Sequence, residues 1–299
     1  MPLTDVTATP LPQLPPRRAD SHKGDYGRAL LIGGSRGMSG AMGLAGMATL
    51  RSGAGLVTLA VPRGIQDVVA SFEPSYMTHG LTDDRGHLAA PAADEVLTLA
   101  ANVTAIALGP GLGRRPVLTE IAARLYDEID KPMVVDADGL FALAERRGVL
   151  TQPAGPRILT PHPGEFARLT GQPYDPSQRA EAAAKLARGE AATGEAASTA
   201  GNHPTTVVLK GHHTVVTDGQ RYSINQTGNP GMATGGSGDV LTGIITALLC
   251  QGLPPFDAAR LGVHVHGLAG DLAAADIGEV SLIASDLLDY LPAAFQTSA

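Results

Sequence analysis

The hydrophobic residues of the chain fall into short runs that alternate with longer, helix-like stretches. The short runs end in Gly, Pro or Asp and cover residues 28–34, 55–62, 103–111, 132–139, 157–165 and 205–211. Each has the length and punctuation of a buried strand. Between them lie Ala- and Leu-rich stretches such as 40–51 and 116–129. Strands without polar alternation, separated by helices, predict a mainly parallel sheet covered by helices on both faces.

Two segments depart from this alternation. Residues 213–225, "HTVVTDGQRYSIN", have the pattern of two strands around an Asp-Gly turn, which predicts a small antiparallel hairpin. Residues 177–204 begin as an Ala-rich helix and then change to Gly, Ser, Thr and Asn, which predicts a surface loop with scope for mobility. No internal repeat or linker is evident. We therefore predict one domain over 24–299, preceded by a Pro-rich, extended lead-in (1–23) that has the composition of a partly disordered segment.

Composition narrows the functional classes. The formal charge of the 299-residue chain is −7 and Lys and Arg form no block, which argues against nucleic-acid binding. The single cysteine, Cys250, excludes an internal disulfide and fits a reducing cytoplasm; its apolar neighbours predict a buried, inert thiol. No segment has the roughly 18 consecutive apolar residues of a membrane helix, and the N-terminus lacks the apolar core of a signal peptide.

The most informative stretch is 225–243, "NQTGNPGMATGGSGDVLTG", which contains six glycines and one carboxylate, Asp239. Apolar residues then follow at helical spacing (240, 241, 244, 245, 248, 249) until Gly252 and Pro254 end the pattern. The glycines therefore form a loop that leads into a helix N-terminus. Free backbone N–H groups and the positive end of the helix dipole favour an anion such as phosphate there.

Asp239 has two interpretations. It could cap the helix and do nothing more. Alternatively, it could deprotonate a hydroxyl that attacks phosphorus, while the glycine loop stabilises the charge that develops on the transferred group. The surrounding glycines favour the second interpretation, because a carboxylate beside a phosphate site is electrostatically costly unless it has a function.

Further candidates lie at the predicted carboxyl ends of strands, where parallel α/β sheets bind ligands. Residues 31–46, "LIGGSRGMSGAMGLAG", run from a strand through glycines into a helix, but fit G-x-G-x-x-G poorly. They form either a tight turn or a second phosphate-binding turn. Lys210 ends another strand and is either solvated or placed to steer a phosphate. His162 is held between two prolines in "TPHPGEF".

Two places in the sequence contain candidate metal ligands. Asp136 and Asp138 in "VVDADGL" could hold hydrated Mg²⁺ through water or cap the next helix. His264 and His266 are two residues apart on a predicted helix and do not share a face, so a zinc site is not predicted there.

Taken together, "GGSRGMSGAMGLAG", "ALGPGLGR", "VVDADGL", "TPHPGEFARLTG", "VVLKGHHTVV" and "NPGMATGGSGDVLTGII" resemble the ADP-dependent NAD(P)H-hydrate dehydratases, a branch of the ribokinase-like superfamily. The match runs from about Gly24 to Leu288. The resemblance implies a three-layer α/β/α fold, Mg²⁺, and often a homotetramer. It also implies the repair of NADHX and NADPHX: ADP phosphorylates the ring hydroxyl, phosphate leaves, and NAD(P)H, AMP and phosphate are the products.

The resemblance also implies roles for individual residues. Asp239 matches the catalytic base and a substrate contact, and Ala41, Gly111 and His162 match the other hydrate-binding positions. The implied nucleotide-binding residues are Lys210, Gly211, His212, His213, Thr214, Asn225, Thr227, Asn229, Thr234, Gly235, Gly236 and Gly238. Many relatives carry an additional N-terminal epimerase domain. Only about two dozen residues precede Gly24 here, so the resemblance implies a separate epimerase as pathway partner.

Two alternatives remain open at this point. The first is a ribokinase-superfamily kinase of a small thiazole- or pyrimidine-type alcohol, whose product would be a stable phosphate ester. The second is a non-catalytic nucleotide sensor on the same fold.

Overall fold

The computed structural model describes residues 2–151, 153–190 and 205–298. Most of the loop predicted at 177–204 therefore lies outside the described residues, whereas its helical start is present as α7 (Arg179–Ala187). Within the described residues no helix is long and apolar enough to cross a membrane.

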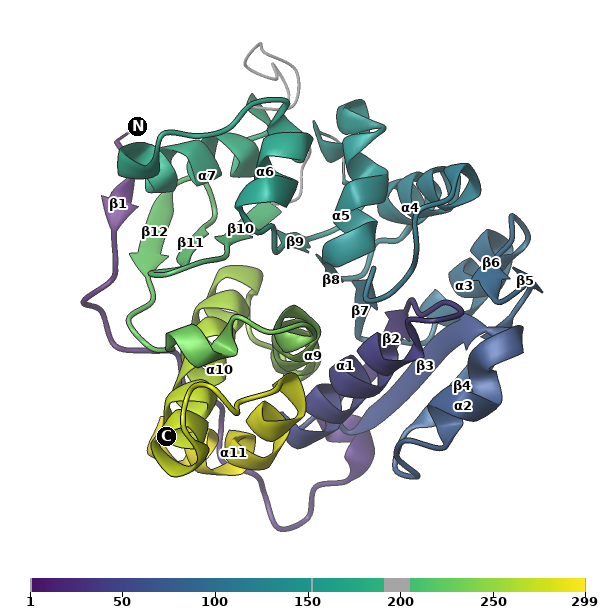
Figure 1. The fold of residues 1–299 in the computed structure, drawn as a ribbon, viewed down its shortest axis with the longest axis horizontal. Helices are drawn as coiled ribbons and strands as arrows, with labels where there is room; N and C mark the ends of the chain where they lie inside the picture. Colours follow the sequence, from purple (N-terminus) through teal and green to yellow (C-terminus); the bar gives the residue numbers. More distant parts are fainter. Residues whose placement is uncertain (1, 152, 191–204, 299) are drawn as a thin grey trace.

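One ten-stranded sheet organises the described residues, in the order β1-β12-β11-β10-β9-β8-β7-β2-β3-β4 (Figure 1). Only β11 runs antiparallel to its neighbours. The strands are β1 (Thr4–Asp5), β2 (Arg28–Ile32), β3 (Leu56–Pro62), β4 (Met77–Leu81), β7 (Ala105–Leu108), β8 (Met133–Val135), β9 (Arg157–Leu159), β10 (Thr205–Leu209), β11 (Val215–Thr217) and β12 (Arg221–Ile224). The predicted mainly parallel sheet with a small antiparallel hairpin is confirmed.

Two helical layers cover the sheet (Figure 1). One contains α1 (Ser39–Arg51), α2 (Gln66–Ala70), α9 (Ser237–Cys250), α10 (Pro255–Ile277) and α11 (Ala284–Thr297). The other contains α3 (Ala92–Ala100), α4 (Pro116–Glu128), α5 (Ala137–Ala144), α6 (Pro163–Thr170) and α7. Strand β2 shows why its sequence lacks polar alternation: Ala29 and Leu31 pack into the first layer, and Leu30 and Ile32 into the second.

The N-terminal lead-in is extended and attached to the sheet. β1 pairs in parallel with β12, and the buried Arg260 of α10 donates hydrogen bonds to the backbone carbonyls of Thr9 and Pro10. Val6 and Leu14 pack against the first core layer. The local sequence did not predict these contacts, because the two residues of β1 are too few to produce a hydrophobic pattern.

Several other elements were not predicted. Strand β4 reads "MTHGL" and lies at the open edge of the sheet, where its first four residues alternate between exposed and half-buried positions and Leu81 is buried. A separate two-stranded hairpin, β5 (Asp83–Asp84) and β6 (His87–Leu88), follows β4. An edge strand needs only one covered face, so it lacks the continuous apolar run that marks central strands.

Candidate functional site

The loops that follow the central parallel strands meet at one edge of the sheet, as the strand ends predicted. Gly33 follows β2, Gly109 follows β7, Asp136 follows β8, Thr160 follows β9 and Lys210 follows β10. Helices α1 and α9 also begin at this edge and pack closely, since a Cβ on Gly243 of α9 would lie 2.3 Å from the Ala45 carbonyl oxygen of α1. Figure 1 shows these two helices side by side.

A partly buried lysine lies among carboxyl groups at the centre of this edge. Lys210 Nζ donates to Asp136 Oδ1 at 2.7 Å and lies 3.9 Å from Glu165 Oε2. The Asp136 side chain is 2% exposed, and its second oxygen accepts from Thr242 Oγ1 of α9 at 2.8 Å. Neighbouring acids raise the pKa of Lys210 against the lowering effect of its burial, so the ammonium group stays charged. The ammonium group is therefore a fixed positive charge that can bind either a carboxylate or a phosphate.

Asp239 lies in the first turn of α9 beside this cluster. Burial, reinforced by the charge of Asp136, raises the pKa of Asp239 to about 7, although Lys210 opposes the change. Its side chain makes no hydrogen bond among the described residues, and no side chain caps α9. The geometry therefore does not support the capping interpretation. A carboxyl group with a pKa near neutrality is suited to accepting a proton from a hydroxyl.

The glycine loop before α9 has the conformation that a phosphate site requires. Gly236 takes the N-cap position at φ +94°, a left-handed conformation, and a Cβ there would lie 2.5 Å from Leu44 Cδ1. Gly238 lies next to the lysine cluster, because its Cβ would be 3.3 Å from Lys210 Nζ. The start of α9, with its free backbone N–H groups, therefore lies close to the ammonium group.

A histidine of α10 contacts the end of this loop. His266 of α10 lies within hydrogen-bonding distance of Ser237, with Nε2 2.9 Å from the carbonyl oxygen and 3.3 Å from Oγ. Burial lowers the pKa of His266 to about 4, so it stays neutral. His264 instead lines a hollow beside the N-terminal lead-in, and its carbonyl accepts from Thr227 Oγ1. The two histidines thus have separate surroundings.

The predicted nucleotide-binding residues form two adjacent segments. Gly211, His212, His213 and Thr214 make the turn between β10 and β11, closed by a 2.9 Å bond from Thr214 Oγ1 to the Gly211 carbonyl. Asn225 N donates to the Thr214 carbonyl and joins the second segment to that turn.

The second segment is attached to α10. Thr227 donates to the His264 carbonyl, while Asn229 Nδ2 and Gly228 N donate to the two carboxylate oxygens of Asp271. Thr234 follows a short 3-10 turn and leads into Gly235 and Gly236. The segment is thereby fixed beside the glycine loop.

The predicted hydrate-binding residues lie in three places at the same edge. Ala41 and Gly111 are neighbours, since a Cβ on Gly111 would lie 3.0 Å from the Ala41 Cβ. His162 is the N-cap of α6, where Nδ1 accepts from the backbone N–H groups of Gly164 and Glu165. Burial and the nearby Lys210 lower the pKa of His162, so the neutral ring carries its proton on Nε2, facing the Glu165 carboxyl.

The two carboxylates considered for Mg²⁺ already have protein partners. Asp138 accepts from Gly113 N and from Arg114 Nε, both at 2.9 Å, and Asp136 is bound to Lys210 and Thr242. In the described ranges no three His, Cys, Asp or Glu side chains form a metal cage. The oxygen-only donors still suit hydrated Mg²⁺, which keeps several waters and binds through one or two carboxylates and substrate phosphates. Asp138 mainly ties the loop after β7 to α5.

Glu165 was not among the predicted site residues. It lies 3.9 Å from Lys210 Nζ, and burial raises its pKa to about 7. A signal for it was present: His162 and Glu165 have the spacing of a capping box, and Glu165 accepts from the His162 backbone N–H. That spacing alone would have predicted a helix start rather than a titratable group in the site.

The sheet between two helical layers and the glycine loop at the start of α9 define the class as ribokinase-like. A ribokinase-like superfamily protein from Enterococcus faecalis is similar over 96% of this chain and 92% of its own, with a TM-score of 0.77 and 26% identity. The ADP/ATP-dependent NAD(P)H-hydrate dehydratase from Bacillus subtilis, co-crystallised with ATP and Mg²⁺, is similar over 96% and 95%, with a TM-score of 0.78 and 34% identity.

Sequence comparison places the chain more narrowly. The family model described as NAD(P)H-hydrate dehydratase matches residues 29–293. The bifunctional NAD(P)H-hydrate repair enzyme Nnr of Moorella thermoacetica is 50% identical over 285 residues, which are 94% of this chain and 51% of that protein. The chain thus spans about half the length of the curated relatives it matches. It belongs to the NAD(P)H-hydrate dehydratase family.

Proposed function

We propose that this chain catalyses the ADP-dependent dehydration of (6S)-NADHX and NADPHX to NADH and NADPH, releasing AMP and phosphate. One observation carries the proposal: Asp239, a carboxyl group with a pKa near 7, lies at a helix N-terminus beside both a glycine loop and the partly buried Lys210. This arrangement joins a base to an anion site, as phosphoryl transfer to a hydroxyl requires.

The proposed reaction has two stages. Asp239 takes the proton of the ring hydroxyl, and the hydroxyl oxygen forms a bond to the β-phosphorus of ADP as the bond to the AMP oxygen breaks. The ring C–O bond then breaks with its electron pair leaving on phosphate, while the adjacent ring carbon loses a proton to solvent water and the electrons of that C–H bond form the double bond. The N–H groups of α9 and the Lys210 ammonium group stabilise the phosphoryl oxygens during transfer.

Mg²⁺, when bound to the nucleotide phosphates, supplies further charge neutralisation at the transferred group. The residues nearest to it would be Asp136, Glu165 and Asp239, acting largely through water. Support comes from the Bacillus subtilis relative, which was co-crystallised with ATP and Mg²⁺. We propose ADP as the phosphoryl donor of this chain. A homotetramer and a cytoplasmic location stay predictions.

The fate of the phosphoryl group tests the proposal against its alternatives. Phosphorus NMR of a reaction containing NADHX, ADP and Mg²⁺ should show AMP and inorganic phosphate accumulating in equal amounts. A stable phosphate ester of a small alcohol, formed from ATP, would instead establish the kinase alternative. Nucleotide binding without any turnover, unchanged in Asp239→Asn, would favour the sensor.

A further inference from the structure

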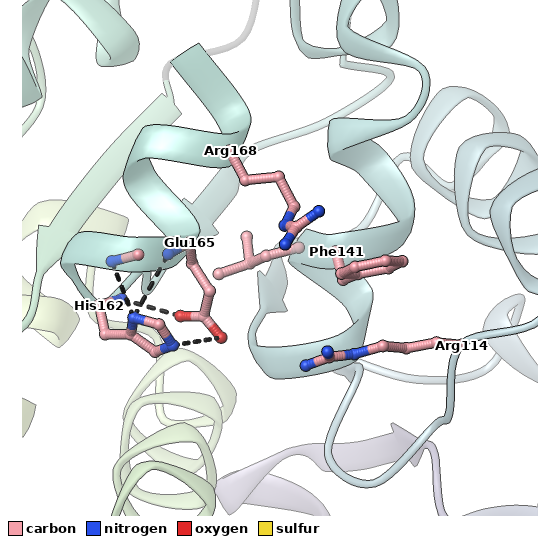
Figure 2. A pocket seen from close by; sticks show the side chains of 7 residues that line it. Arg114, Phe141, His162, Glu165 and Arg168 are labelled. Carbon is pink, nitrogen blue, oxygen red and sulfur yellow. Dashed lines mark hydrogen bonds and ion pairs between the residues drawn. The ribbon is translucent and has the colours of Figure 1, made fainter. Parts of the chain in front are cut away.

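A hollow of about 230 Å³ lies between α5 and α6, next to the cluster around Lys210. Arg114, Phe141, His162, Glu165 and Arg168 line it (Figure 2). Glu165 belongs to both places, since it faces the hollow and lies 3.9 Å from Lys210 Nζ. The hollow therefore adjoins the proposed active site, although none of the reactions above uses its two arginines.

Both arginines are positioned by one aromatic ring. The guanidinium carbons of Arg114 and Arg168 each lie 4.6 Å from the centre of the Phe141 ring. Figure 2 shows the two groups above and below that ring. Such stacking holds each guanidinium group by cation–π attraction while leaving its edge free to donate hydrogen bonds. Phe141 lies on α5, so a helix fixes the spacing of the two charges.

The charges in the hollow are not balanced. Arg114 uses its Nε to bind Asp138, whereas the guanidinium of Arg168 makes no hydrogen bond or ion pair with any of the described residues. Glu165, the acid that lines the hollow, has its pKa raised by burial to about 7, and burial lowers the pKa of His162. Two guanidinium groups thus face the hollow with incomplete compensation, which favours an anionic ligand.

We propose that Arg114 and Arg168 bind a phosphate group of the dinucleotide hydrate, in the hollow beside His162. This inference rests on the proposed function, because it assigns part of the same substrate. Planar guanidinium groups recognise phosphate by paired hydrogen bonds, which an apolar or neutral ligand could not exploit. The phosphate is either the pyrophosphate bridge, present in both hydrates, or the 2′-phosphate, present only in NADPHX.

The test compares Arg168→Gln with Arg51→Gln. Arg168 is exposed, and apart from its stacking on Phe141 its guanidinium has no hydrogen-bond or ion-pair partner among the described residues, so its variant should fold normally, with a nearly unchanged Tm. Arg51, an exposed arginine at the opposite end of α1, is the matched control. Loss of a charge-assisted hydrogen bond should raise the hydrate KM by about ten- to a hundredfold, with little change in kcat or in the ADP KM. Arg168→Lys should recover part of this loss.

The two hydrates identify which phosphate is bound. A KM that rises equally for NADHX and NADPHX assigns the pyrophosphate, and a rise for NADPHX alone assigns the 2′-phosphate. Unchanged KM values for both hydrates, or a rise in the ADP KM instead, would overturn the inference while wild-type turnover leaves the proposed function intact. Wild-type protein without any turnover would reject the proposed function itself.

Discussion

Replacing Asp239 with Asn should change activity and stability in opposite directions. Asp239 is desolvated and faces the like charges of Asp136, Asp138 and Glu165, which outweigh the attraction of Lys210 and raise its pKa from 3.8 to about 7. An amide of the same shape removes the proton acceptor, so turnover should fall by about a thousandfold. It also removes a charge that the folded protein holds at a cost.

The gain in stability expected for Asp239→Asn depends on pH. Between pH 4 and pH 7 the folded protein keeps a proton on Asp239 that the unfolded chain has lost, so wild-type stability falls as pH rises through this window. Each pKa unit corresponds to about 1.4 kcal/mol, which gives an upper value of about 4 kcal/mol above pH 7. Asp239 also loses its attraction to Lys210 when it becomes Asn, and this lowers the expected value. We therefore expect Asp239→Asn to be more stable than wild type by about 2–4 kcal/mol at pH 8 and by nearly nothing at pH 4.

Urea unfolding at pH 4, 5, 6, 7 and 8 measures this difference directly. Asp175→Asn is the control: hydrogen bonds from Ser177 lower the pKa of that exposed carboxyl, so its variant should show no gain that grows with pH. An Asp239→Asn protein that is equally or less stable than wild type at every pH would refute the argument that Asp239 is a costly, desolvated carboxylate. Retention of most activity would separately remove it from the role of base.

Three further predictions follow from the same cluster. Lys210→Met leaves the buried carboxylate of Asp136, 2.7 Å away, without its cation, and should lower the free energy of unfolding by about 3–5 kcal/mol in urea at pH 7. The control, Lys185→Met at an exposed position, should cost almost nothing. A loss below about 1 kcal/mol for Lys210→Met would contradict the pairing of Lys210 with a buried carboxylate. The kcat/KM for the hydrate should rise with pH and reach half its maximum near pH 7, as Asp239 loses its proton; a flat profile from pH 5.5 to 8.5 would exclude that group. Gly236→Ala should lower the free energy of unfolding by about 1–3 kcal/mol and weaken ADP binding in calorimetry. The reason is that φ is +94° and that Cδ1 of Leu44 on α1 would lie 2.5 Å from the new Cβ. The control is Gly235→Ala, which should keep the stability of wild type because its Cβ meets nothing within 4 Å.

The local sequence pattern was sufficient to predict those features of the fold that depend on residues close together in the chain. The hairpin around Asp218-Gly219, the helix that follows the glycine loop and the strand ends at one edge were all predicted from residues a few positions apart, although the helix begins inside the predicted loop, at Ser237. The interpretation of Asp239 as more than a cap rested on adjacent glycines in the same way. These features need no knowledge of the tertiary structure.

Contacts between distant segments had no such signal. Lys210 and Asp136 are 74 residues apart in the sequence. Nothing in the residues around either one shows that the lysine would form an ion pair with Asp136, which was predicted as a candidate Mg²⁺ ligand. Likewise, Arg114 and Arg168 come together only because α5 places Phe141 between them. The pKa of Glu165 depends on burial, which the capping-box spacing does not reveal.

The central claim is best tested by incubating the purified chain with NADHX, Mg²⁺ and either ADP or ATP, and following the absorbance of reduced nicotinamide. Our account predicts that absorbance returns with ADP, that AMP forms in equal amount, and that Asp239→Asn shows almost no recovery. Recovery with ATP alone would contradict the proposed phosphoryl donor. No recovery with either nucleotide, from folded protein that still binds ADP, would contradict the dehydratase function.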